Sequence, residues 1–247
     1  DMTNADSIVN TAHAAPPKII TAASAYTDVD KAESAPDLAM AINGTGPGIL
    51  AEEANKLGAA LIHYSTDYVF DGAKGEPYTE VDEPNPLNVY GYSKLIGERV
   101  VQAVGEAYLI IRTSWVYSLR RPCFVTKMLK WARENEILRV VEDQISSPTW
   151  ARTLAEATGQ IIAQGREFPV AFVRENRGLY HLTGGGHCSR YEWAKAILEN
   201  DPQREEQLVK ELLPVRSDYF SVPAQRPEKS ILENQKLTNC FTLHIPH

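Results

Sequence analysis

The chain lacks a long apolar segment, has few cysteines and carries no excess of positive charge. No apolar run approaches the roughly 18 residues that a transmembrane helix needs, so the sequence predicts no membrane partner. The net charge is −7 and the basic residues are dispersed, which argues against a nucleic-acid partner. Cys123, Cys188 and Cys240 are far apart and odd in number, which argues against a disulfide framework and a zinc site. We therefore expect a reducing, cytoplasmic location and no metal site.

What is present suits a globular protein with a sizeable core. The 247 residues are 43% hydrophobic and 23% charged, enough for one large domain or one and a half. Apolar spacing predicts helices at 6–15, 36–57, 90–104, 124–135 and 154–164, and strands at 19–23, 58–64, 108–112 and 138–141. This alternation predicts an α/β fold, in which helices cover both faces of a doubly wound parallel sheet.

The pattern changes beyond residue 178. Residues 180–182 predict a short strand, Ser189 caps a predicted helix over 189–199, and the prolines that follow indicate loops. We therefore expect a sheet domain over 1–150 and a smaller lobe mainly within 151–247, with some chain crossing back to the sheet.

The most informative stretch is 61–94. An apolar strand closes on Ser65, Thr66 and Asp67, and ligands of open parallel sheets bind at this carboxyl end of the strands. After a loop rich in glycine and proline, a helix places Tyr90 and Lys94 four residues apart on one face. A phenol beside an ammonium, near a threonine hydroxyl, predicts proton transfer. The alternative is a core tyrosine and a solvated lysine, and the polar strand end favours catalysis.

Other candidates have more ordinary readings. The Gly-Thr-Gly-Pro-Gly segment at 44–48 lies within a helical pattern, whereas a dinucleotide fingerprint follows a strand, so we favour close helix packing over phosphate binding. Trp115 could be core, but a flat apolar surface suits a deoxysugar. Arg226 could bind a diphosphate or pair with a carboxylate, and both readings stay open. His63 and His181 are expected to be hydrogen-bonded core groups.

Five segments carry a resemblance to a known family. In chain order they are YSTDYVFDG, PLNVYGYSKLIGE, RTSW, DQISSPT and AQRPEKSILENQKL, and AYTDVDKAE upstream fits the same pattern. Over nearly its whole length the chain resembles the dTDP-4-dehydrorhamnose reductases of the extended short-chain dehydrogenase/reductase family. The resemblance implies a Rossmann-like dinucleotide-binding domain and a substrate-binding lobe. It also implies hydride transfer from NADPH or NADH to the 4-keto group of a dTDP-linked deoxyhexulose, giving dTDP-L-rhamnose for polysaccharide biosynthesis. A homodimer and bound Mg²⁺ belong to the same family pattern.

The resemblance also assigns roles to particular residues. Tyr90 would donate the proton, Lys94 would bind the nicotinamide ribose and lower the pKa of Tyr90, and Thr66 would hydrogen-bond the reacting oxygen. A free phenol has a pKa near 10, and lowering it by about 3 units requires roughly 4 kcal/mol, which a neighbouring cation supplies only in a largely dry cleft. The implied cofactor contacts are Ala25, Tyr26, Thr27, Tyr64, Tyr90, Lys94, Asp1 and Met2, and the implied substrate contacts are Thr66, Asp67 and Trp115.

The sequence also departs from the family pattern. The family's first strand, glycine-rich turn and helix have no counterpart, so we expect a fragment that holds the nicotinamide end of the cofactor and leaves strand 19–23 with an unpaired edge. Cys123 ends a segment where the family has Gly-x-Asn, and Ser146 replaces a glycine. Two alternatives remain: a catalytically silent binding or regulatory subunit, and a related nucleotide-sugar epimerase or dehydratase.

Overall fold

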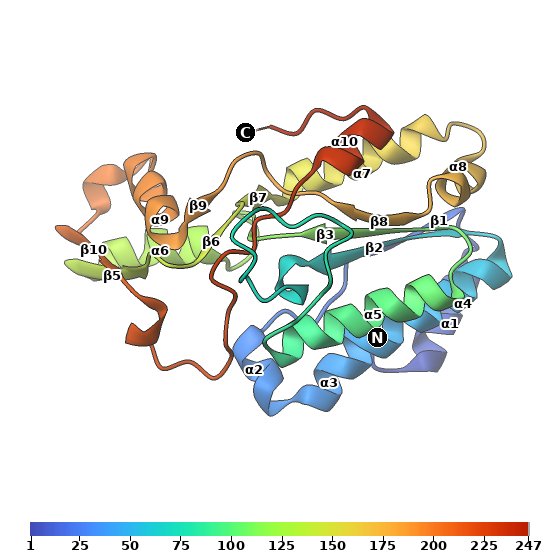
Figure 1. Cartoon of the computed structure of the whole chain (residues 1–247), viewed down its shortest axis with the longest axis horizontal. Helices are drawn as coiled ribbons and strands as arrows, with labels where there is room; N and C mark the ends of the chain where they lie inside the picture. Colours follow the sequence, from blue (N-terminus) through green and yellow to red (C-terminus); the bar gives the residue numbers. More distant parts are fainter. Residues whose placement is uncertain (247) are drawn as a thin grey trace.

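The computed structural model describes residues 1–246 and shows a parallel sheet with helices on both faces (Figure 1). Its strands follow the order β1 (Ile19–Ala22), β2 (Ala60–Thr66), β3 (Tyr108–Thr113) and β8 (Gly178–His181). All neighbouring strands in this sheet are parallel. The α/β prediction is confirmed, and the predicted strand near residue 180 lies beside β3 in the main sheet.

The two faces of β2 build two different cores, because successive side chains of a strand point to opposite faces. Leu61 joins a cluster beneath α4 (Gly46–Leu57) and α5 (Val89–Val104). Ile62 joins a cluster on the other face, with residues of α7 (Ala151–Gln164), α8 (Pro169–Glu175) and α10 (Gln235–Phe241). Burial on both faces explains the continuous apolar run of this strand.

The helix expected over 36–57 is a chain of three helical segments. These are α3 (Pro36–Met40), a π-helical turn (Ala41–Thr45) and α4, and the left-handed Gly58 ends the last of them. Gly44 and Gly48 pack against α5, since a Cβ on Gly48 would lie 2.3 Å from Cγ1 of Val100. The prediction of close helix packing is confirmed.

A smaller cluster lies to one side of the sheet (Figure 1). Here β5 (Ile137–Val141) pairs in parallel with β10 (Glu211–Val215), and residues of α6 (Phe124–Glu134) and α9 (Arg190–Glu199) complete an apolar core. Ser189 caps α9 as expected. The two groups alternate along the chain: α6 and β5 of the smaller cluster precede residue 150, whereas α7 and β8 follow it and belong to the sheet.

Short pairings join the two groups of elements. β4 (Val116–Tyr117) pairs with β7 (Thr149–Trp150), and β6 (Ile145–Ser146) pairs with β9 (Cys188–Ser189). The segment 224–232 then runs back across the junction and forms bridges from Lys229 to Ile145 and from Leu232 to Tyr78.

Three further features concern the chain outside these pairings. The helix α1 (Ala5–Ala14) packs on α4, and the short α2 (Val29–Ser34) packs on α5. Within residues 1–246, β1 pairs with β2 alone. No helix in this part of the chain is both long and apolar enough to cross a membrane.

Candidate active site

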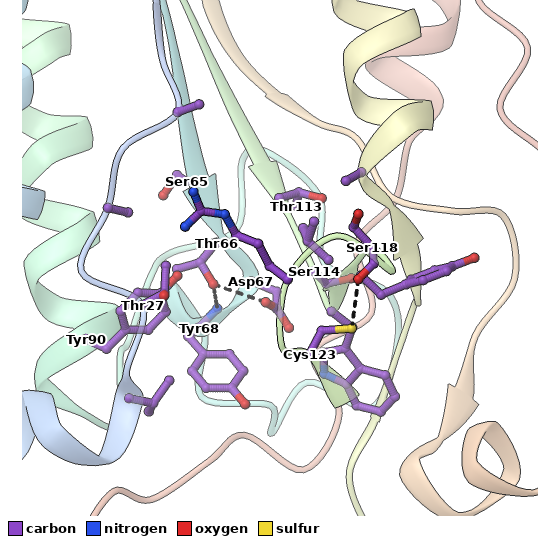
Figure 2. A pocket seen from close by; sticks show the side chains of 18 of the residues that line it. Thr27, Ser65, Thr66, Asp67, Tyr68, Tyr90, Thr113, Ser114, Ser118 and Cys123 are labelled. Carbon is purple, nitrogen blue, oxygen red and sulfur yellow. Dashed lines mark hydrogen bonds between the residues drawn. The ribbon is translucent and has the colours of Figure 1, made fainter. Parts of the chain in front are cut away.

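A cavity of about 980 Å³ opens at the carboxyl ends of β1, β2 and β3 (Figure 2). Its walls come from the loops that follow these strands, from the start of α5, and from the smaller lobe through Cys123 and Arg190. Ligands of open parallel sheets bind at this edge. The predicted position of the site is therefore occupied by a cavity large enough for a small-molecule ligand.

Thr66 and Tyr90 meet in this cavity. Thr66 ends β2, and its Oγ1 donates to Asp67 Oδ1 at 3.2 Å and accepts from the Tyr68 amide at 3.2 Å. Tyr90 enters from the first turn of α5, which Asn88 caps through a bond from the Gly91 amide of 2.8 Å. A Cβ on Gly91 would lie 2.1 Å from the Tyr68 carbonyl oxygen, so only glycine allows this close approach. The cap and the glycine together bring the phenol to the strand end.

Burial raises the pKa of Tyr90 well above its usual range, and a hydrogen bond with Thr66 offsets part of this effect. The expectation that Lys94 lowers the pKa of Tyr90 is therefore wrong in this structure. The physical reason is that the same burial disfavours both charges: it also lowers the pKa of Lys94 to about 8. At neutral pH both groups carry their protons.

Lys94 lies one turn beyond Tyr90, on the same face of α5 as predicted. Its side chain is 3% exposed, and Nζ donates to the Tyr64 carbonyl oxygen at 2.5 Å. It is not among the residues that line the cavity. The ammonium is thus positioned behind the cavity wall by the backbone of β2.

Asp67 lines the cavity but is already held by other side chains. Its Oδ2 accepts from Ser230 Oγ at 2.5 Å and lies 3.3 Å from Ser146 Oγ. Burial raises the pKa of Asp67 to about 6, although the hydrogen bonds favour the charged form. Ser146, which the sequence marked only as a departure from a glycine, therefore helps to fasten the carboxyl group.

The expected cofactor contacts divide into two sets. Ala25 and Thr27 line the cavity. Tyr26 does not, and its backbone amide donates to Asn43 Oδ1 at 2.9 Å while its carbonyl accepts from Asn43 Nδ2 at 3.0 Å. The hydroxyl of Tyr64 lies 2.7 Å from Thr158 Oγ1, on the α7 side of the sheet.

The first two residues lie elsewhere. Asp1 and Met2 line a separate cavity of about 460 Å³ with residues of α1 and β1. The structure thus brings Ala25, Thr27, Thr66, Asp67, Tyr90 and Trp115 together. It does not bring the side chains of Tyr26, Tyr64, Asp1 or Met2 to them.

Two buried hydroxyls in the cavity wall have no partner within residues 1–246. These are Ser65 Oγ and Thr113 Oγ1, at the ends of β2 and β3. A buried polar atom without a partner is unfavourable, so these two hydroxyls mark a polar wall. Ser24, Thr27 and Thr66 add further hydroxyl-bearing side chains to the lining, and a wall of this kind fits the nicotinamide ribose of NADPH or NADH.

No group of three or more histidine, cysteine, aspartate or glutamate side chains within residues 1–246 is arranged to hold a metal ion.

Trp115 has a backbone φ of 40°, a left-handed conformation that is rare for a bulky residue. Its ring stacks on Trp193 at 5.5 Å and lies in the cavity wall. Arg226 forms a two-pronged ion pair with Asp30, at 3.1 and 2.6 Å, so the carboxylate alternative is the one observed.

The two histidines differ. His181 Nδ1 lies 3.2 Å from the Tyr78 carbonyl oxygen, whereas neither ring nitrogen of His63 has a partner within residues 1–246. The expectation of a hydrogen-bonded core group is wrong for His63. Burial lowers the pKa of His63, so its ring is neutral.

The sequence reasoning missed Arg190, Ser230 and a second cavity. Arg190 lines both cavities, and the second has a volume of about 550 Å³ and lies mostly in the smaller lobe. The only sequence signal was that Arg190 follows the capping Ser189 at the start of α9. Ser230 belongs to a segment expected to be loop, and its distance along the chain from Asp67 concealed its role.

Comparisons with known proteins agree with this geometry. Residues 1–247 match the family model of the RmlD substrate binding domain. The chain is 39% identical to the dTDP-4-dehydrorhamnose reductase of Escherichia coli K12, over 100% of this chain and 81% of that protein. It is 37% identical to the enzyme of that name from Burkholderia thailandensis, over 100% and 83% of the two chains. A crystal structure of dTDP-4-dehydrorhamnose reductase from Bacillus anthracis in complex with NADP superposes with a TM-score of 0.88, at 35% identity, over 100% and 82% of the two chains.

Proposed function

Because the chain belongs to the RmlD substrate binding domain family, that of the dTDP-4-dehydrorhamnose reductases, we propose that it reduces the 4-keto group of dTDP-4-dehydro-L-rhamnose. The product is dTDP-L-rhamnose, a precursor for polysaccharide biosynthesis, and the reductant is NADPH or NADH. One observation carries the proposal: the hydroxyls of Thr66 and Tyr90 meet at the carboxyl end of β2, inside a cavity, with the Lys94 ammonium directly behind.

When bound, NADPH or NADH would supply the hydride that reduces the carbonyl carbon of the sugar. As that carbon is reduced, its oxygen becomes an alkoxide and needs a proton, which the Tyr90 hydroxyl donates. The raised pKa of Tyr90 keeps the phenol protonated at neutral pH, so the acid is loaded before the reaction begins. With the sugar bound, the Thr66 hydroxyl would turn from Asp67 and donate a hydrogen bond to the same oxygen.

Binding contacts follow from the walls of the cavity. Ala25 and Thr27 would lie against the nicotinamide end of the cofactor, and Lys94 would hold its ribose. Thr66, Asp67 and Trp115 would contact the deoxysugar, with the indole ring supplying a flat apolar surface. A cytoplasmic location, supported by the three free cysteines, remains a proposal. Dimerisation and Mg²⁺ binding remain expectations from the family resemblance alone.

Tyr90→Phe tests the proposed chemistry. The variant keeps the ring and removes the proton donor, so we expect kcat for reduction of the dTDP-linked keto sugar to fall about 10²–10⁴-fold while the affinity for dTDP stays the same. The rate is measured as oxidation of NADPH. Tyr92→Phe is the matched control, because Tyr92 lies on the same helix turn with 49% of its surface exposed, and it should keep full activity. A Tyr90→Phe enzyme within threefold of the wild type would refute the assignment, and an inactive wild type would favour a silent binding subunit.

A further inference from the structure

Arg190 differs from the other buried and half-buried arginines because it has no carboxylate partner in the part of the chain that the structure describes. Within residues 1–246, four arginines are buried or half-buried, namely Arg112, Arg133, Arg190 and Arg226. The other three bind carboxylates: Arg112 binds Glu98 at 2.7 Å, Arg133 binds Asp201 at 3.0 Å, and Arg226 binds Asp30 at 2.6 Å. Arg190 forms no ion pair with any carboxylate of the described chain. A partly buried guanidinium without an anion is unfavourable, so an anionic ligand would stabilise this position.

The side chain is held in place by aromatic groups. The guanidinium carbon lies 3.6 Å from the ring centre of Trp115, 5.0 Å from that of Phe124 and 5.7 Å from that of Trp193. Stacking of this kind fixes the plane of the guanidinium and leaves its N–H groups free to bind a ligand.

Arg190 lies between two cavities whose linings differ. The first cavity contains Thr66 and Tyr90, where the sugar carbonyl would react. The second is lined by aromatic side chains including Phe124, Trp131 and Phe220, together with polar groups such as Gln144. Both cavities share Trp115, Val116, Pro122, Cys123 and Arg190, so they adjoin along this wall.

We propose that Arg190 binds the diphosphate of the sugar-nucleotide substrate and so positions the sugar at Thr66 and Tyr90. The inference rests on the proposed function, because a nucleoside diphosphate sugar carries its negative charge between its sugar and its nucleoside. With the sugar in the first cavity and the nucleoside in the aromatic second cavity, the diphosphate passes the shared wall. The planar fork of an arginine matches two phosphate oxygens. The nearby Asp67 carboxyl forms no ion pair with it and is held by Ser230 and Ser146 instead.

The test is Arg190→Met in the full-length protein, which keeps an apolar stem against Trp115 and removes the charge. Calorimetric titration with dTDP should show a loss of affinity of about 10–100-fold, the range expected for hydrogen bonds to a charged group. Titration with thymidine, which has no phosphate, should be unchanged. In the reductase assay KM for the keto sugar nucleotide should rise by a similar factor, whereas KM for NADPH should change less than twofold. Arg190→Lys, which keeps a charge without the fork, should give an intermediate affinity for dTDP.

Arg152→Met is the matched control. Arg152 also stacks on a tryptophan, 5.5 Å from the ring of Trp150, but it is exposed and lines neither cavity. Its substitution should leave every titration unchanged.

The possible outcomes separate the two proposals. Unchanged dTDP affinity in Arg190→Met, or an equal loss of dTDP and thymidine affinity, would overturn the role of Arg190, and so would a wild type that fails to bind dTDP. A wild type that binds dTDP through Arg190 but does not reduce the keto sugar would instead overturn the proposed function alone.

Discussion

At the scale of single residues, a hydrogen-bonded row from Thr66 through Asp67 to Ser230 joins side chains from two distant parts of the chain, beside Tyr90 in the same cavity. Thr66 and Tyr90 could be predicted because each sits in a local pattern, one at a strand end and one on a capped helix. Ser230 and Arg190 could not, because the bond from Ser230 to Asp67 spans 163 residues and no local pattern reports it. The raised pKa of Tyr90 was also unpredictable, since it depends on burial by the whole cavity wall.

Asp67 gives a pH prediction at this scale. Its pKa is about 6 in the folded chain against an ordinary value of 3.8, so the folded state holds the proton more tightly than the unfolded state does. Stability from this group is fully present below about pH 4 and is lost as the pH rises through 6, by about 3 kcal/mol. Asp67→Asn should therefore show a gain in the free energy of unfolding, relative to wild type, that is larger at pH 7 than at pH 4. Urea unfolding across this pH range measures it.

Asp82 provides a control, because its pKa is shifted in the opposite direction from that of Asp67. Although burial acts to raise its pKa, hydrogen bonds from Lys74 and Thr79 lower it to about 2. Its stabilising effect is present at neutral pH and is lost as the pH falls through 2, so Asp82→Asn should destabilise the chain at pH 7. If Asp67→Asn destabilised the protein at pH 7 to the same extent, the buried carboxylate would be a net stabilising group after all.

At the scale of elements, most helices and strands followed from apolar spacing, and the exceptions have physical causes. The strand β10 was expected to be loop because Pro214 lies within it. A proline is tolerated there because β10 pairs only with β5 in the described chain, so the missing N–H faces no second strand. The π-helical turn at 41–45 was not predicted either, because it depends on the approach of α5, which local spacing does not contain.

Two glycine substitutions test how closely α5 approaches the π-helical turn. A Cβ on Gly97 of α5 would lie 2.1 Å from the Asn43 carbonyl oxygen, a backbone atom that cannot rotate away. Gly97→Ala should force the two helices apart and destabilise the chain by about 1–3 kcal/mol. Gly159 of α7 meets nothing within 4 Å, and Gly159→Ala should instead stabilise it by about 0.5–1 kcal/mol through helix propensity. Chemical denaturation of both variants measures the difference, and equal effects would show that the α5 contact is not tight.

At the scale of the whole molecule, the chain passes repeatedly between the sheet and the smaller lobe. The sheet character was predictable from the alternation of elements. The membership of each lobe was not, because α6 and β5 leave the sheet group and α7 and β8 rejoin it. The return of chain from the 151–247 lobe to the sheet was expected, but which elements cross is set by which apolar faces meet.

This interleaving predicts a single unfolding transition. Neither cluster can close from a continuous piece of chain, so loss of one removes connections needed by the other. Met128 is fully buried in the smaller lobe, and Met128→Ala should remove about 2–5 kcal/mol. Scanning calorimetry should show one transition that moves to lower temperature as a whole. A separate early transition in the variant would mean that the lobe folds independently.

The segment 224–232 determines when the site becomes complete during translation. Ser230 fastens Asp67, Arg226 is tied to Asp30, and the Gln225 carbonyl accepts from Asn88 at 2.7 Å, so three early parts of the chain are joined by one late part. During translation Thr66, Tyr90 and Lys94 leave the ribosome long before the residues that secure this part of the chain. The site of a growing polypeptide therefore stays incomplete until residues 224–232 have emerged.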